Sequence, residues 1–224
     1  MGYLLIFGLF MLASWAIGAR LKSKFREYSK IPVNYNMSGR EVAEKMLHDN
    51  GVTDVSVLSV NGELTDHYNP QHKTVNLSPD VYNGRSIAAA AIAAHECGHA
   101  IQHAQAYSWL QFRSAMVPIV SFSSKWVQWI LLGGILLINT FPQLLLAGIV
   151  LFALTTLFSF VTLPVEIDAS RRATAWLDGS GIASTATLPK AQEALRLAAY
   201  TYVIAALASL ATLMYYIMIF LRRD

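Results

Sequence analysis

Four long apolar runs restrict the fold of this chain more than any other feature of its sequence. They cover residues 3–19, 126–140, 144–163 and 197–221, and the second run is short unless it borrows residues before Lys125. A helix of about 20 apolar residues crosses a bilayer core, and it pairs its own backbone polar groups, as lipid requires. We therefore predict a mainly α membrane protein of the α+β class, with about four transmembrane helices embedded in a lipid bilayer.

The charged residues gather in two polar blocks, residues 20–125 and 164–196, which four spans would place on the same side of the membrane. Of the 17 Lys and Arg residues, eleven lie in the first block and four in the second. Because basic residues are retained on the cytoplasmic side, both blocks are predicted to face the cytoplasm. Basic residues follow the first apolar run rather than precede it, unlike those of a cleavable signal peptide, so this run is interpreted as an uncleaved anchor.

Residues 30–84 are typical of soluble protein. Ser38 followed by Glu41 predicts a capped amphipathic helix that ends near residue 50. Two β-rich segments, residues 52–60 and 64–68, flank an Asn-Gly pair that favours a hairpin turn, and a third strand is predicted over residues 73–77. We therefore expect a small antiparallel β meander, whose last strand would offer its edge to an extended peptide substrate. The predicted substrate-edge residues are Thr74, Val75 and Asn76.

Residues 95–99 (HECGH) match the zinc-binding helix of metallopeptidases. Side chains four residues apart lie on one helix face, so His95 and His99 can bind one Zn²⁺. Glu96 lies to the side of that face, where it can act as general base toward a water without binding the metal. The alanine-rich stretch before the motif favours a helix. The single cysteine, Cys97, excludes an internal disulfide and points away from the ligand face.

Catalytic zinc takes a third protein ligand, and several residues are candidates for it. His103 continues the helical spacing but lies about 12 Å along the axis from His95, too far to bind the same ion. His67 and His72 lie in turn-rich sequence. His67 and His72 stay possible ligands, although a surface position is favoured for His72.

Two acidic residues of the second polar block are further candidates. Asp178 belongs to a Leu-Asp-Gly sequence that resembles a ligand motif of site-2 intramembrane proteases, although its charged surroundings favour a helix-ending turn. Glu166 follows Pro164 at the start of a predicted helix over residues 165–177, where the hairpin of membrane spans returns the chain to the side of the zinc motif. Glu166 is the stronger candidate.

Three stretches together resemble the YugP-type neutral zinc metallopeptidases of bacterial membranes. They are residues 64–68 (LTDHY), 93–102 (AAHECGHAIQ) and 162–173 (TLPVEIDASRRA). The resemblance extends over nearly the whole chain, and it is more distant to the HtpX and CAAX-prenyl-protease group. It implies a gluzincin-like peptidase of the bacterial cytoplasmic (inner) membrane, one zinc ion per chain and Glu166 as third ligand.

The sequence departs from the general gluzincin pattern in one respect. Gluzincins often carry, four residues after the ligand glutamate, an aspartate that orients a zinc histidine, and this chain has Ser170 at that position. Ser170 and Asp66 are therefore the candidates to orient a ligand. The candidates to stabilise the transition state are His67, Tyr68, Arg171 and Arg172.

These assignments predict a domain organisation in five parts: residues 1–19, a transmembrane anchor; 20–110, a cytoplasmic zincin-like part; 111–163, an interfacial segment and transmembrane hairpin; 164–196, a cytoplasmic helix with the third ligand; and 197–224, a C-terminal transmembrane helix.

The predicted function is peptide-bond hydrolysis by a zinc-activated water with Glu96 as general base. Two alternatives remain open: a site-2-type intramembrane protease, and a zinc-dependent membrane scaffold or chaperone without hydrolytic activity. The expected partner is a peptide or membrane-protein substrate. A nucleic-acid partner is not needed to explain the net charge of +3, because basic residues flank membrane helices in general. The sequence does not indicate an oligomeric state.

Overall fold

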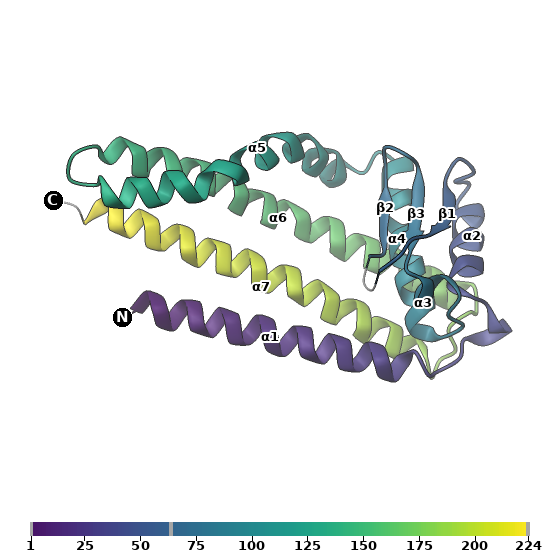
Figure 1. Cartoon of the computed structure of the whole chain (residues 1–224). Coiled ribbons are helices and arrows are strands. Elements are labelled where there is room, and N and C mark those ends of the chain that lie inside the picture. The colour runs from purple at the N-terminus through teal and green to yellow at the C-terminus, as the bar shows by residue number, and fades with distance from the viewer. Residues whose placement is uncertain (1, 63–64, 223–224) are drawn as a thin grey trace. The chain divides into compact units, whose positions relative to one another are not determined.

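The computed structural model describes residues 2–62 and 65–222, and of residues 2–6 the backbone only. Leu64 of the first family motif and the terminal Arg223 and Asp224 lie outside the described residues. The elements follow one another as α1 (Gly2–Tyr28), η1 (Asn34–Asn36), α2 (Gly39–Asp49), β1 (Ser56–Ser59), β2 (His67–Asn69), β3 (Thr74–Leu77), α3 (Pro79–Tyr82), α4 (Ile87–Ala104), α5 (Ser108–Leu136), α6 (Pro142–Gly179) and α7 (Leu188–Leu221) (Figure 1). The predicted mainly α class with a small sheet is confirmed.

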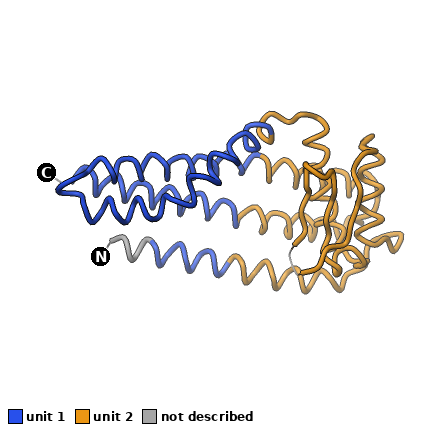
Figure 2. The backbone as a smooth tube through the Cα atoms, turned by 45° about the horizontal axis from the view of Figure 1, so that its top comes forward, with its two compact units in different colours: residues 1–16, 111–164, 201–224 blue, residues 17–110, 165–200 orange. Residues whose placement is uncertain are grey.

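The chain forms two compact units (Figure 2). Unit 1 comprises residues 1–16, 111–164 and 201–224, and unit 2 comprises residues 17–110 and 165–200. Unit 2 contains the whole sheet and the zinc-motif helix α4.

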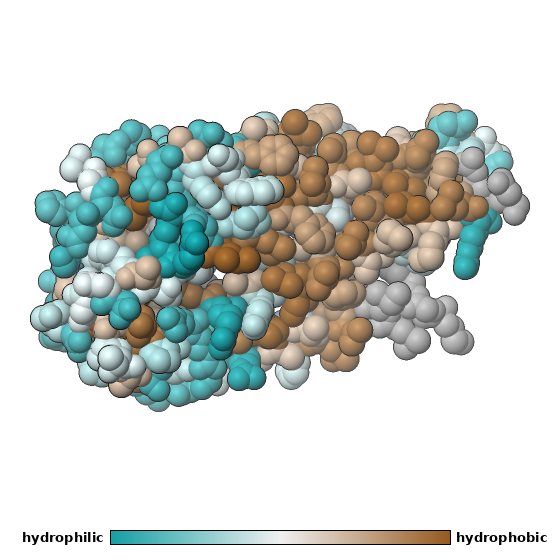
Figure 3. All heavy atoms as spheres, turned by 180° about the vertical axis from the view of Figure 1, so that it is seen from behind, coloured by the Kyte–Doolittle hydropathy of each residue, from teal (hydrophilic) through white to brown (hydrophobic). Residues whose placement is uncertain are grey.

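Unit 1 consists of apolar helices. In the described part of the chain, α5, α6 and α7 are each long and apolar enough to cross a membrane. Hydrophobic side chains gather over the helices of unit 1 (Figure 3), and α5 exposes large ones such as Phe122, Trp126 and Trp129. These features indicate association with a membrane, as predicted. Residues 3–19 belong to helix α1, but a fourth span formed by them stays a prediction.

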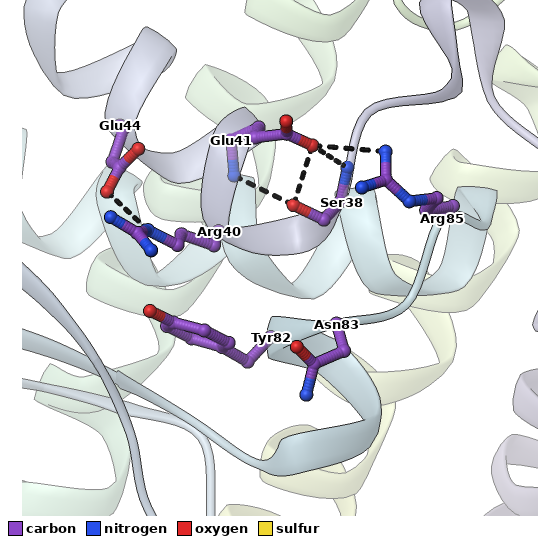
Figure 4. A pocket seen from close by; sticks show the side chains of 7 residues that line it. All are labelled: Ser38, Arg40, Glu41, Glu44, Tyr82, Asn83 and Arg85. Atoms are coloured by element: carbon purple, nitrogen blue, oxygen red, sulfur yellow. Dashed lines mark hydrogen bonds and ion pairs between the residues drawn. The ribbon is translucent and has the colours of Figure 1, made fainter.

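Unit 2 is held together by an apolar core between α2, α4 and the sheet. The predicted capped helix is confirmed: Ser38 Oγ accepts a hydrogen bond from Glu41 N, and the Glu41 carboxylate accepts one from Ser38 N at 2.7 Å (Figure 4). Arg85 Nη1 donates a further bond to Glu41 at 3.2 Å. Val42 and Met46, on the inward face of α2, are fully buried. Capping therefore determines where the helix begins, and burial determines which of its faces packs against the core.

The sheet is mixed, and the predicted antiparallel meander is wrong. The strand order is β1-β3-β2, with β1 parallel to β3 and β2 antiparallel to it. Val75 and Leu77 are completely buried on one face of β3, and Asn76 is 7% exposed on the other, whereas β1 is largely exposed. A strand covered on both faces belongs at the centre of a sheet, so β3 separates the two segments that were expected to form a hairpin.

This strand order also changes the predicted substrate edge. Thr74, Val75 and Asn76 are each paired with β1 on one side and with β2 on the other. They therefore have no free edge for a peptide, and that prediction is wrong. The open edges of the sheet belong to β1 and β2.

Glu166, the candidate for the third ligand, does not lie at the start of a helix. Helix α6 continues through Pro164, although proline lacks the N–H that would bond the carbonyl four residues earlier. The carbonyl left without this bond is that of Phe160, and apolar helices tolerate such a proline because neighbouring groups satisfy the freed backbone. The predicted helix start at residue 165 is therefore wrong.

Candidate metal centre

Three side chains of unit 2 meet at one point: His95 and His99 from α4 and Glu166 from α6. One ligand atom of each lies within 4.8 Å of those of the other two. Glu166 Oε2 is 3.3 Å from His95 Nε2 and 3.6 Å from His99 Nε2. Glu166 is buried, with 5% of its surface exposed, and the two histidines are partly exposed. The third ligand position left open by the zinc motif is thus filled by a carboxylate from a distant part of the chain.

The donor set suits zinc. Bonds of about 2.0–2.1 Å in a tetrahedral site place neighbouring donor atoms about 3.3–3.4 Å apart. The two distances to Glu166 are close to that value. Two histidines and one glutamate leave a fourth position for water, which distinguishes catalytic zinc sites from structural ones.

A glycine allows the two helices to approach each other. A Cβ atom on Gly98 would lie 2.7 Å from the Ala169 carbonyl oxygen and 3.1 Å from its Cα. A backbone approach this close excludes any side chain at position 98. Gly98 lies next to His99 and Ala169 lies three residues after Glu166, so this contact sets the separation of the ligands.

Each zinc-motif histidine has a hydrogen-bond partner on its outer ring nitrogen. Ser170 Oγ lies 3.1 Å from His95 Nδ1, and Gln102 Oε1 lies 3.1 Å from His99 Nδ1. Both contacts leave Nε2 facing Glu166. Burial acts to lower the pKa of His99, but the carboxylates of Glu166 and Glu96 outweigh it and hold this pKa above its ordinary value.

Glu96 lies beside the three ligands and outside their group. Its carboxylate is nearly buried, and Oε2 accepts a hydrogen bond from the backbone N–H of Tyr68 at 3.0 Å. The edge strand β2 therefore holds the general base predicted from the motif through its main chain.

The other predicted residues near β2 have partners of their own. Asp66 accepts hydrogen bonds from the N–H and hydroxyl of Ser78 at 2.7 and 3.2 Å. His67 donates from Nδ1 to the Thr65 carbonyl, and its Nε2 accepts a bond from Asn76. The Tyr68 hydroxyl lies 2.9 Å from His103 Nδ1. These contacts organise the sheet and its approach to α4.

Arg171 and Arg172 both form ion pairs with Asp168. Asp168 was not among the predicted site residues, and neither was Gln102, although both lie within the family motifs. The spacing of Gln102, three residues after His99, places it next to that ligand on the helix, which was the available signal. Among the described residues, the grouped ligands include none of the alternative third ligands, which were His67, His72, His103 and Asp178.

Comparisons with known proteins agree with this geometry. A family model described as "Putative neutral zinc metallopeptidase" matches residues 3–221. The chain is 42% identical over 210 residues to the "Putative membrane protease YugP" of Bacillus subtilis (strain 168), an alignment that covers 94% of this chain and 92% of that protein. No solved structure matches the chain. The resemblance inferred from the three sequence motifs is confirmed.

Proposed function

Because the chain belongs to the zinc metallopeptidase family whose model matches residues 3–221, we propose that it is a membrane-bound zinc endopeptidase that hydrolyses peptide bonds. The observation that carries this proposal is the position of Glu96. Its nearly buried carboxylate lies one residue from His95, beside a ligand set of two histidines and Glu166. A purely structural zinc site would need no such base and would close with a fourth protein ligand.

His95, His99 and Glu166 would hold the zinc, which when bound supplies a Lewis acid that acidifies a water molecule. Glu96 takes the proton from the attacking water and passes it to the leaving amine. The hydrogen bond from Tyr68 N to Glu96 Oε2 restricts the rotation of this carboxylate. A base held in this way loses less entropy when it meets the water.

We infer that a substrate binds along the outer edge of β2. The Tyr68 N–H of this strand is already bonded to Glu96, so the remaining main-chain groups of the edge would pair with the substrate. With β3 in the centre of the sheet, an extended peptide or an unfolded segment of a membrane protein would pair with β2. Main-chain pairing of this kind tolerates many sequences. The same strand supplies the Tyr68 N–H to Glu96, so it connects the proposed substrate surface with the base.

We place the protein in the bacterial cytoplasmic membrane as a multi-pass protein with its site facing the cytoplasm. Three helices long and apolar enough to cross a membrane support this placement. The distribution of the Lys and Arg residues supports its orientation.

The substitution Glu96→Gln tests the mechanism. It keeps the volume and the hydrogen bond of the side chain and removes its basicity, so zinc should stay bound while peptide cleavage falls at least about 100-fold. The measurements are metal analysis and hydrolysis of a quenched fluorescent peptide library by purified full-length protein. Chelation should abolish wild-type cleavage and added zinc should restore it.

Glu44→Gln is the matched control, because Glu44 is an exposed residue of α2 that pairs with Arg40. Its activity should equal that of the wild type. Normal turnover by the Glu96→Gln protein would refute the proposed mechanism, and a wild type that binds zinc but cleaves nothing would favour the scaffold.

A further inference from the structure

Gln102 is a buried amide that connects the two ligand-bearing helices. Its exposed surface is 0%, and it lies in the last turn of α4. Nε2 donates to the Val165 carbonyl at 2.9 Å and to Asp168 Oδ2 at 3.0 Å, while Oε1 faces His99 Nδ1 at 3.1 Å. Val165 and Asp168 lie on either side of Glu166 in the chain. The Gln102 amide therefore contacts one ligand, His99, directly and the residues that flank another, Glu166.

These partners allow only one orientation of the amide. A backbone carbonyl accepts hydrogen bonds and does not donate them. The Asp168 carboxylate forms ion pairs with Arg171 and Arg172, which keep it ionised and therefore an acceptor as well. A flipped amide would place Oε1 against two acceptors and leave both unpaired in a buried site, at a cost of about 1–3 kcal/mol for each lost bond.

The orientation of the amide decides where His99 carries its proton. Oε1 can only accept, so His99 Nδ1 must donate to it. The lone pair of the neutral ring is then on Nε2, the nitrogen that faces Glu166. Ser170 has no such effect on His95, because a hydroxyl can either donate or accept.

We propose that Gln102 is a positioning residue that fixes the tautomer and orientation of His99, with Asp168 and its two arginines as the anchor of the amide. This inference rests on the proposed zinc site. It makes the two histidines unequal: the tautomer of His99 is imposed by the protein, whereas that of His95 adjusts to the metal.

The test compares zinc affinity in two variants of Gln102 and one control, all as purified full-length protein. Gln102→Met keeps a side chain of similar size and removes every hydrogen bond. Gln102→Glu keeps an acceptor for His99 but removes the donor to Val165 and Asp168. Gln192→Met is the control, because Gln192 is an exposed residue of α7 that belongs neither to the grouped ligands nor to the anchor of the amide.

Competition with a fluorescent zinc chelator should show binding about 10–100-fold weaker for Gln102→Met, a smaller loss for Gln102→Glu, and unchanged binding for Gln192→Met. A residue that only filled space would give the opposite order of the two Gln102 variants, because an apolar side chain is buried at less cost than a carboxylate. Equal affinities of Gln102→Met and Gln192→Met, or that opposite order, would overturn the proposal.

A second readout uses cobalt in place of zinc and does not require the methionine variant to fold. Gln102→Glu loses the donor to Val165 and Asp168, so its visible cobalt absorption bands should shift from those of the wild type, and unchanged bands would refute the anchoring role of Asp168. A wild type that binds no zinc in the competition assay would instead refute the metal site on which the proposed function depends.

Discussion

Gly98 allows α4 and α6 to pack closely, and the geometry of the metal site depends on that close packing. We expect Gly98→Ala to force its Cβ against the Ala169 carbonyl, 2.7 Å away, and to push the helix carrying Glu166 away from His95 and His99. The strain should cost about 1–3 kcal/mol of unfolding free energy, and zinc affinity should fall with it. Thermal unfolding and chelator competition measure the two effects.

Gly179→Ala is the control for this substitution, because nothing lies within 4 Å of a Cβ atom built at that position. It should leave zinc affinity unchanged. Wild-type affinity in the Gly98→Ala protein would show that the two helices can separate without disturbing the ligands.

At the residue scale, spacing within one helix could be predicted and contacts between helices could not. His95, Glu96 and His99 follow from a five-residue pattern, and Glu166 followed from its position after the membrane hairpin, with the resemblance to a family in support. Gln102 and Asp168 were missed, because a buried amide gains its role from partners 63 and 66 residues away. Ser170, predicted as an orienting residue, lies 3.1 Å from His95 Nδ1, and its role stays a prediction.

At the scale of elements, the N-terminus of α2 gives a direct test of local stability. Ser38→Ala removes the hydroxyl that caps the helix, and we expect the unfolding free energy to fall by about 1 kcal/mol. The two bonds from Ser38 also hold the pKa of Glu41 below its ordinary value, so this pKa should rise in the variant. Circular dichroism during heating measures the stability change.

Ser59→Ala, at an exposed position of β1, should change stability by no more than about 0.5 kcal/mol. If both serine variants unfolded at the same temperature, the capping bonds would contribute nothing to stability.

The helix α2 and all three strands were predicted, but the pairing of the strands was not. Alternation and an Asn-Gly pair describe each segment and its turn, whereas strand order depends on which strand the rest of the unit covers on both faces. The burial of Val75 and Leu77 on one face of β3 and of Asn76 on the other decided that order. Likewise, Pro164 is a sound local signal for a helix start, and the continuous apolar helix around it overrode the signal.

For the whole molecule, the predicted orientation in the membrane can be read from a single introduced thiol. The native Cys97 is fully buried, and burial raises the pKa of its thiol, so it should not react. In intact cells, an impermeant maleimide should label Thr140→Cys, between α5 and α6, but not His72→Cys, which lies in the first polar block. Both positions are exposed in the structure.

Cell lysis should make the His72→Cys protein reactive, which controls for the accessibility of that thiol. Labelling of His72→Cys in intact cells would place the zinc motif on the outer side of the membrane and contradict the predicted orientation.

The bond between Tyr68 N and Glu96 has an evolutionary consequence. The donor belongs to the main chain, so every amino acid except proline can supply it. The bond itself therefore places no restriction on the side chain at position 68, whose own hydroxyl contacts His103. The identity of that residue in an alignment would report on the side-chain contacts of the strand and not on its bond to the base.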